Sequence, residues 1–436
     1  RCRELINKNG NSLSTIILQM LREIPALGEA LANKEAEDHF LEQAFDNLLD
    51  AEDEVKLTFL PNPFFRNQHA YLLGEVTCGK VSRPFAIAII NPPEGIMADA
   101  LLTTEEEIKR IFAFSRSYLI TSSSDPWGAI HFLIQLMPSK TEEQLIINLG
   151  YLDAGRHRML QKLKIHLRSR GSRFNYAPGI PGMVMLVFTL PDYPLVIKLI
   201  RDDIRPPKSI RKEQVLRKYD FVAKHDRAGR LADVQLYDYL VLPRQYFDEK
   251  LLEDLLEQTA ESVKLRGDFV VLEQVFIERK MRPLNLFLQE ADEEDKKAAI
   301  LDYGNAIKEM AKINIFPGDL LIKNFGVARD RRLVFYDYDE VCTLQECEFR
   351  KMPEPRYEDQ IMSAEPWYSV NENDVFPEEF ASFTVPRGPL FDQFKQHHGE
   401  VFEADFWNYW KEFYASGKVL DLQPYDNSRY EASRKD

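Results

Sequence analysis

Apolar residues recur at two different spacings in the first 170 residues and divide them into strands and helices. Segments 56–60, 70–76 and 85–90 are rich in β-forming residues, which predicts a small meander closed by the proline loop at 91–93. Helical spacing predicts helices over residues 12–49, 104–118, 127–137, 141–150 and 156–170. No nucleophile, base and oxyanion donor come together here, so we interpret this part as a regulatory or interaction domain. A purely structural role would explain the pattern equally well.

The pattern changes after residue 170, where short strands precede long helices. Strands are predicted at 184–190, 195–200, 234–242, 269–277 and 333–336, and helices at 206–230, 251–265 and 298–313. Near the C-terminus, Phe402, Phe406 and Tyr409 recur at helical spacing within segment 390–413. Core packing explains such an aromatic stripe better than ligand stacking.

Composition limits the classes of function. A chain of 436 residues is too long for one hydrophobic core, so we expect two or three domains. Its net charge of -14 opposes binding to nucleic acid or to an anionic membrane surface. The longest largely apolar run, 183–190, suits a buried strand and is too short to span a bilayer.

The cysteines and histidines form no familiar ligand pattern. The four cysteines are scattered without a CxxC pair, and the eight histidines include no HExxH motif. We therefore expect neither a disulfide scaffold nor structural zinc, and we predict a cytoplasmic location. The chain begins at Arg1 without a signal peptide, and we expect the protein to extend further at this end.

Segment 315–340 concentrates the residues that carry chemistry. Asp319 is followed five places later by Asn324, and a predicted strand then delivers Asp337 and Asp339. Such groups are costly to bury unpaired, so we expect them to face a cation or a polar substrate. Phosphoryl-transfer enzymes place a catalytic base and two metal ligands in this order.

A glycine loop and a lysine upstream complete this pattern. Gly179 and Gly182 precede the strand at 184–190 and would let the backbone approach a phosphate, although an ordinary turn is the commoner use of such glycines. Lys198 lies inside the next apolar strand, where kinases hold the lysine that contacts the α- and β-phosphates. Loop, lysine and segment 315–340 together predict a kinase-like site.

Two acidic residues near this pattern are ambiguous from local sequence alone. Asp233, at the mouth of a strand, suits a polar site and a turn equally well. Glu213 is the only glutamate in the predicted helix 206–230, yet its surroundings do not assign it the pairing role that kinases give a glutamate there. Segment 278–281 falls where a kinase hinge meets adenine.

Beyond these single residues, the chain resembles the bacterial isocitrate dehydrogenase kinase/phosphatase family. The resemblance rests on residues 177–190 (APGIPGMVMLVFTL), 224–227, 277–279, 303–307, 315–340 and 363–380 (SAEPWYSVNENDVFPEEF). It implies an α+β protein, in which a bilobal protein-kinase-like catalytic domain over 171–436 follows an α/β regulatory domain over 1–170. The small lobe would cover about 171–280 and the large lobe about 281–436.

The family resemblance also implies a bifunctional activity. ATP would be used to phosphorylate a serine of NADP-dependent isocitrate dehydrogenase, and the same protein would remove that phosphate, which sets flux between the citric acid cycle and the glyoxylate bypass. ATP, ADP and Mg²⁺ or Mn²⁺ would be the cofactors, with AMP as an allosteric effector. The dehydrogenase is the expected partner, and a homodimer is an expected assembly.

Site roles follow from the resemblance residue by residue. Asp319, Asp233 and Asp339 would be catalytic, with Asp233 serving the phosphatase activity. Asn324 and Asp337 would hold the metal, and Asp337 and Asp339 match the family's Asp-Tyr-Asp motif. The nucleotide would be bound by Lys198 and by a loop made of Ala177, Pro178, Gly179, Ile180, Pro181, Gly182 and Met183.

Two other classes of function remain open from the residues alone. Pro317-Gly318-Asp319 with Asn324 also resembles the loop of small-molecule phosphotransferases such as aminoglycoside kinases. A nucleotide-sensing protein with a degenerate kinase fold is the non-enzymatic alternative. The intact set of Lys198, Asp319, Asn324 and Asp337 speaks against the second of these.

Overall fold

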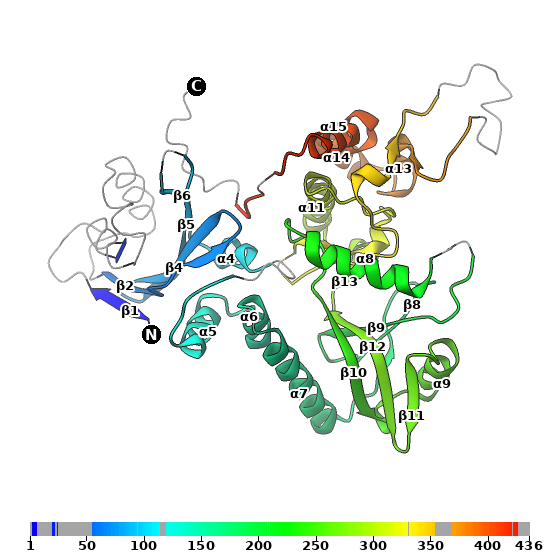
Figure 1. The fold of residues 1–436 in the computed structure, drawn as a ribbon, viewed down its shortest axis with the longest axis horizontal. Coiled ribbons are helices and arrows are strands. Elements are labelled where there is room, and N and C mark those ends of the chain that lie inside the picture. Colours follow the sequence, from blue (N-terminus) through cyan, green and yellow to red (C-terminus); the bar gives the residue numbers. More distant parts are fainter. Residues whose placement is uncertain are drawn as a thin grey trace. The chain divides into compact units, whose positions relative to one another are not determined.

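The computed structural model describes residues 2–6, 20–21, 24, 55–93, 95–113, 119–206, 208, 210–329, 331–353, 368–420 and 422–425 (Figure 1). The chain forms two compact units, Arg1–Lys162 with Gln423–Asp436 and Leu163–Leu422. The helix predicted over 12–49 lies almost wholly outside the described residues. Among those residues, no helix combines the length and the apolar character needed to cross a bilayer.

The first unit is built on an antiparallel sheet. Its strand order is β1-β2-β4-β5-β6, with β3 paired to β4. The predicted meander is confirmed and extended by strands at both edges. The strands are β1 (Arg3–Ile6), β2 (Val55–Phe59), β3 (Phe64–Arg66), β4 (His69–Cys78), β5 (Val81–Ile90) and β6 (Met97–Leu102).

Helices bury one face of this sheet. Side chains from α4 (Glu105–Ile111), α5 (Pro126–Leu136) and α6 (Glu142–Asn148) share one buried apolar cluster with Tyr71 and Leu73 of β4. The capping box predicted for α4 is present, since the Thr104 hydroxyl accepts the Glu107 N–H and the Glu107 carboxylate accepts the Thr104 N–H. The helix ends earlier than predicted, at Ile111, and residues 114–118 lie outside the described part. Helix α7 (Leu152–Arg170) follows α6.

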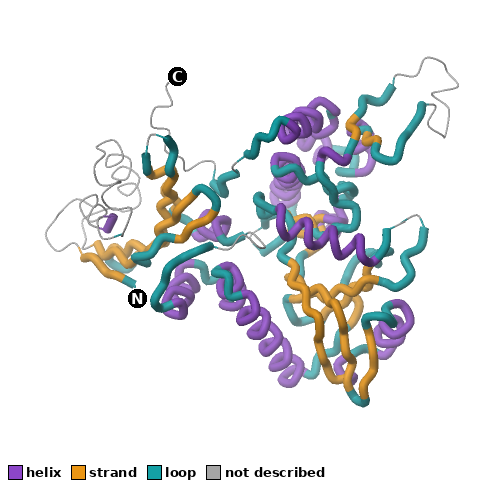
Figure 2. The backbone as a smooth tube through the Cα atoms, viewed as in Figure 1, coloured by secondary structure: helices purple, strands orange, loops and turns teal. Residues whose placement is uncertain are grey.

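The second unit begins with another antiparallel sheet, of order β10-β12-β9-β8-β7 with β11 paired to β12. In Figures 1 and 2 these strands gather at one end of the unit, and α11, α14 and α15 gather at the other. We call these ends the sheet half and the helical half. The sheet half contains β7 (Asn175–Tyr176), β8 (Met185–Thr189), β9 (Leu195–Ile200), α8 (Lys212–His225), β10 (Val234–Pro243), α9 (Glu249–Gln258), β11 (Val263–Arg266) and β12 (Phe269–Arg279).

Two predicted helices of the sheet half are too long. Residues 263–266 belong to β11 rather than to the helix predicted over 251–265, because they pair with β12 across a turn at Gly267, whose φ is +58°. The helix ends at Thr259, whose hydroxyl donates to the Leu255 carbonyl at 2.6 Å. The other helix, predicted over 206–230, covers only Lys212–His225.

The helical half packs around α11 (Glu293–Lys312). Tyr303 and Ile307 of this helix are fully buried together with Phe325, Phe335 and Trp407. In the predicted aromatic stripe, Phe402 is buried, but Tyr409 is 60% exposed. The remaining elements are β13 (Arg282–Pro283), α10 (Leu284–Glu290), β14 (Phe325–Val327), β15 (Leu333–Phe335), β16 (Glu348–Phe349), β17 (Asp374–Val375), α13 (Phe380–Phe383), α14 (Pro389–His398) and α15 (Ala404–Ala415).

Candidate active site

A tight loop between α11 and β14 carries Asp319. Its entry pairs with the chain beyond β15, since Phe316 and Cys342 exchange backbone hydrogen bonds of 2.8 and 3.0 Å. Gly318 has a φ of +79°, and a Cβ there would lie 2.4 Å from Cβ of Glu340 and 2.7 Å from its carbonyl oxygen. Only glycine fits this approach, so the turn before Asp319 is determined by backbone geometry.

Asp319 and Asn324 lie on one interconnected turn. The Asp319 carboxylate accepts the N–H of Leu321 at 2.9 Å, and the Asn324 amide donates to the Asp319 carbonyl at 3.3 Å. Asn324 is 3% exposed. Tyr303 reinforces the turn from α11, because its buried hydroxyl donates to the Leu320 carbonyl. The predicted base, Asp319, and the predicted metal ligand, Asn324, therefore lie on a turn that these hydrogen bonds fix.

Asp337 and Asp339 follow β15 as a coupled pair. Burial, with the charge of Asp339 and a hydrogen bond to it, raises the pKa of Asp337 to about 8. Burial would also raise the pKa of Asp339, but the hydrogen bond with Asp337 and the ammonium of Lys208, 2.9 Å away, hold it below its ordinary value. Two negative charges on this pair are therefore unfavourable.

The buried lysine has a partner that the sequence reasoning did not name. The Lys198 ammonium lies 2.8 Å from the Glu278 carboxylate and 3.0 Å from the Tyr336 carbonyl, and 5.1 Å from the centre of the Tyr336 ring. Both Lys198 and Glu278 are 5% exposed. Glu278 belongs to β12, whereas Glu213 on α8 is exposed.

The sequence offered only a weak signal for this pair. Lys198 is the one charged residue of β9, but β12 contains Glu273, Glu278 and Arg279, so the partner could not be assigned before the register was known. The observed register places Lys198 opposite Phe276, which makes Glu278 its diagonal neighbour on the same face.

Asp233 reaches the same region through a parallel bridge. Leu231 pairs with Phe335, with hydrogen bonds from the Ala232 N–H to the Phe335 carbonyl (2.9 Å) and from the Phe335 N–H to the Arg230 carbonyl (2.7 Å). Asp233 and Asp337 each lie two residues beyond this bridge, one on each chain. The Asp233 carboxylate accepts a 2.7 Å hydrogen bond from Gln235.

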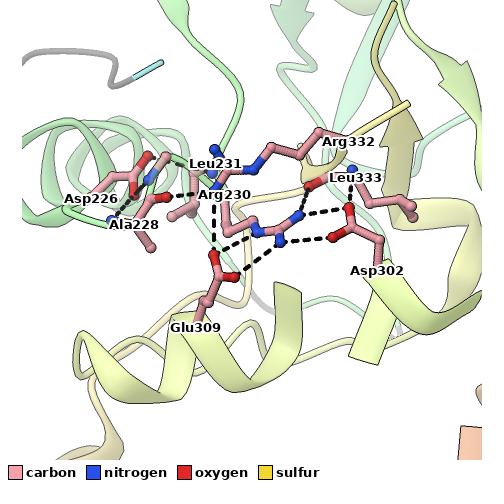
Figure 3. Close-up of polar contacts among 9 residues, drawn as sticks. Asp226, Ala228, Arg230, Leu231, Asp302, Glu309, Arg332 and Leu333 are labelled. Atoms are coloured by element: carbon pink, nitrogen blue, oxygen red, sulfur yellow. Dashed lines mark hydrogen bonds and ion pairs between the residues drawn. The ribbon is translucent and has the colours of Figure 1, made fainter. Parts of the chain in front are cut away.

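A buried charge cluster holds this bridge in place (Figure 3). The guanidinium of Arg230, 4% exposed, makes two hydrogen bonds to Asp302 (2.7 and 2.8 Å) and two to Glu309 (2.7 and 3.0 Å), and both carboxylates project from α11. Arg230 also donates to the Leu333 carbonyl at 3.1 Å, while the Leu333 N–H donates to Asp302 at 2.7 Å. Bidentate pairs of this kind set geometry strictly, so the strand leading to Asp337 and the segment leading to Asp233 are both anchored on α11.

The predicted nucleotide loop is an exposed stretch at the end of the sheet. Residues 178–183 are all exposed, and Gly179 has a φ of +119° with no atom within 4 Å of where its Cβ would be. The loop is held at its ends, where the Ala177 N–H donates to the Val187 carbonyl at 3.0 Å and Arg201 donates to the Gly182 carbonyl at 3.3 Å. Its role in binding a nucleotide stays a prediction.

The two predicted metal ligands have the donor chemistry of a divalent-cation site. Asp337 offers carboxylate oxygens and Asn324 an amide oxygen, which Mg²⁺ prefers. A cation bound there would offset the burial and the charge of Asp339 that raise the pKa of Asp337. No cluster of three or more His, Cys, Asp or Glu side chains suited to a metal occurs among the described residues, so this site would be completed by the amide and by substrate oxygens.

An antiparallel sheet bearing a buried lysine, next to a helical half bearing Asp319, Asn324 and Asp337, defines the chain as a protein-kinase-like enzyme scaffold. Residues 172–427 match the family model described as isocitrate dehydrogenase kinase/phosphatase (AceK) kinase domain, and residues 3–171 match the model of the same family's regulatory domain. The chain belongs to the isocitrate dehydrogenase kinase/phosphatase family. The predicted family and fold class are thereby confirmed.

Curated relatives support the same family. The chain is 40% identical over 390 residues to the isocitrate dehydrogenase kinase/phosphatase of Paraburkholderia phytofirmans, covering 88% of this chain and 64% of the relative. It is 41% identical over 415 residues to that of Methylibium petroleiphilum, covering 94% of this chain and 66% of the relative. The chain thus spans slightly less than two thirds of these relatives.

Among solved structures, the bifunctional kinase-methyltransferase WbdD aligns with 55% of this chain and 46% of its own. The sequence identity is 11% and the TM-score is 0.25, which is too low to bear on the fold.

Proposed function

We propose that this protein is a bifunctional enzyme that phosphorylates a serine of NADP-dependent isocitrate dehydrogenase with ATP and removes that phosphate again. The proposal rests on one observation above all: the residues that kinase chemistry needs, Lys198, Asp319, Asn324 and Asp337, are all present in a chain that belongs to this family. Inactivation and reactivation of the dehydrogenase would direct carbon into the glyoxylate bypass or the citric acid cycle.

In the kinase direction, each residue has a role that suits its surroundings. Asp319 accepts or orients the proton of the substrate hydroxyl, and Lys198 neutralises charge on the α- and β-phosphates of ATP. Asn324 and Asp337 would hold Mg²⁺, which supplies charge neutralisation across the phosphates when bound. Positioning and electrostatics dominate such transfers, and the braced turn at Asp319 provides the positioning.

In the phosphatase direction, Asp233 and Asp339 are carboxylates that an ordinary kinase does not need. Either can orient a water toward the phosphoserine, or help return the phosphoryl group to ADP in the same site. One shared site is favoured because the bridge between Leu231 and Phe335 brings the segment of Asp233 beside that of Asp337. AMP would act on the balance between the two activities as an allosteric effector.

The test separates the two activities by substitution. Asp337→Ala should abolish phosphorylation of purified isocitrate dehydrogenase, measured by transfer of radioactive phosphate from ATP. Asp233→Ala should lower release of phosphate from phosphorylated dehydrogenase more than it lowers the kinase rate. Asp238→Ala is the matched control, because Asp238 is exposed on β10, the strand that follows Asp233.

Three results would contradict the proposal. A full kinase rate in Asp337→Ala removes the metal assignment, and equal loss of both activities in Asp233→Ala leaves that residue with a structural role. Phosphorylation of small alcohols in place of the dehydrogenase would favour a small-molecule phosphotransferase. Running each assay with and without AMP tests the effector.

A further inference from the structure

Two cysteines lie in contact just beyond Asp339. The Sγ atoms of Cys342 and Cys347 are 3.4 Å apart, and both thiols are free. A disulfide bond measures about 2.05 Å, so the two sulfurs need to approach by about 1.4 Å to form one. The other two cysteines, Cys2 and Cys78, belong to the first unit.

The two thiols differ in a way that suits oxidation in sequence. Cys347 is 5% exposed, while Cys342 is only partly buried. The hydrogen bond between the thiols lowers the pKa of Cys342, which favours its thiolate. We therefore expect an oxidant to react with Cys342 first. Cys347 would be the resolving thiol, which reacts with the oxidised Cys342 sulfur.

Cys342 is tied to the segment that carries the predicted catalytic base. Its backbone exchanges two hydrogen bonds with Phe316, and Glu340 packs directly against Gly318. Asp319 is the next residue after Gly318. A shift of Cys342 toward Cys347 would therefore act directly on Phe316 and Gly318, the residues that lead into Asp319.

We propose that Cys342 and Cys347 form a reversible disulfide on exposure to a hydroperoxide, and that this bond slows phosphoryl transfer. In the first step the Cys342 thiolate attacks a peroxide oxygen and the O–O bond breaks, which gives a sulfenic acid and a hydroxide that takes up the proton lost by the Cys342 thiol and becomes water. In the second step the Cys347 thiol attacks the Cys342 sulfur, the S–S bond forms, the S–O bond breaks, and the leaving hydroxyl takes the Cys347 proton and departs as water. Two thiols and one hydrogen peroxide thus give one disulfide and two waters.

Formation of the bond is independent of the protein's activity, whereas its effect on rate rests on the proposed function. Misplacement of a reacting group by about 1 Å can cost about 100-fold in rate. We expect oxidation to lower kcat for phosphorylation of the dehydrogenase by about tenfold or more, because the turn that positions Asp319 is displaced.

The experiment treats the full chain, first reduced and freed of reductant, with hydrogen peroxide, and then alkylates free thiols. Trypsin releases both cysteines in one peptide, residues 333–350, because no lysine or arginine lies between Arg332 and Arg350. A disulfide appears in mass spectrometry as a peptide that has lost two hydrogens and resists alkylation at both sulfurs. Dithiothreitol should restore the free thiols and the rate together.

The control variants are Cys342→Ser, Cys347→Ala and Cys78→Ser. The first two should keep their rate after peroxide treatment, and Cys78→Ser should lose it as the unaltered chain does. Two variants of the pair guard against misfolding, since only Cys347 is deeply buried.

Several outcomes would overturn the proposal. These are a sulfinic acid at Cys342 without a cross-link, a cross-link that leaves the rate unchanged, or equal inactivation of Cys342→Ser. If the reduced chain transfers no phosphate at all, the proposed function fails instead. In that case mass spectrometry still detects the disulfide. Its effect on the turn is then measured as faster amide hydrogen exchange at residues 316–321.

Discussion

Removal of the Arg230 guanidinium tests how the candidate site is held together. In Arg230→Met, an unbranched apolar chain replaces the arginine and leaves the carboxylates of Asp302 and Glu309 in place. Four hydrogen bonds between 2.7 and 3.0 Å are lost, together with the 3.1 Å contact to the Leu333 carbonyl. Arg332 still reaches Glu309, at 3.2 Å.

The size of the effect follows from burial of the remaining charges. The side chains of Asp302 and Glu309 are 24% and 30% exposed, so water replaces the guanidinium poorly. Removing one partner of a buried ion pair costs about 3–5 kcal/mol, mostly because the other charge is left uncompensated. We expect Arg230→Met to lower the free energy of unfolding of the second unit by about this amount at pH 7.

The pH dependence gives the sharper test. Burial would raise the pKa of both carboxyls, but hydrogen bonds and charge from Arg230 outweigh it and hold both below their ordinary values. In the unaltered chain this stabilises the fold above about pH 4 and is lost as the pH falls further. In Arg230→Met only the weaker contributions of Arg332 and of the Leu333 N–H still oppose burial, so the pKa values rise and the two carboxylates destabilise the fold as the pH increases. The difference between the two proteins should therefore grow from pH 4 to pH 7.

Urea denaturation at several pH values, followed by tryptophan fluorescence, measures this difference, since Trp407 is fully buried in the same unit. The triple variant Arg230→Met, Asp302→Asn, Glu309→Gln is the control. It keeps hydrogen-bond acceptors but carries no stranded charge, so it should be more stable than the single variant and lose the pH trend. A pH-independent loss in the single variant would refute the electrostatic reasoning and leave a packing defect as the cause.

Three other substitutions probe the site itself. Lys198→Met should lower kcat/KM for phosphorylation of the dehydrogenase by about 100-fold, and an unchanged value would exclude Lys198 from phosphate contact. Glu278→Gln leaves the Lys198 ammonium, whose residue is 5% exposed, without its carboxylate, so it should lower the free energy of unfolding by about 3–5 kcal/mol and also lower kcat; native-like stability with a normal kcat would refute the role given to this pair. Gly318→Ala should cost about 1–3 kcal/mol of stability, because φ is +79° and Glu340 leaves no room, and should lower kcat; native-like melting and kcat would show that the turn adapts.

The longer strands could be predicted from the sequence because they depend on local patterns, whereas β1, β3 and β6 were not predicted. Strand β9 was predicted at the residues where it occurs, and segment 315–340 was recognised from spacing alone. The partners of the site residues could not be predicted, because they depend on register and on contacts distant along the chain. Glu278 meets Lys198 only through the register of β9 and β12, and Arg230 meets Asp302 and Glu309 across more than 70 residues.

Errors in helix length have a similar origin. Segment 263–266 has the composition of a helix end. It forms a strand because its backbone groups pair with those of β12 in a hairpin. Local propensity is a weak preference of about 1 kcal/mol or less per residue, and such pairing overrides it. Roles of Asp233, Asp319 and Asp339 in catalysis remain predictions, which the proposed assays address.

The hydrogen bonds from Arg230 to Asp302 and Glu309 hold the residues just before Asp233 on the helical half. Strand β10, which begins directly after Asp233, belongs to the sheet half. A hinge between the two halves would therefore have to lie beyond Ala232, whose backbone is bonded to Phe335. Opening at such a hinge would carry Lys198 away with the sheet while the segments of Asp233, Asp319 and Asp337 travel as one body. The three carboxylates would then stay together throughout the catalytic cycle. Only the contacts between Lys198 and the nucleotide would form and break.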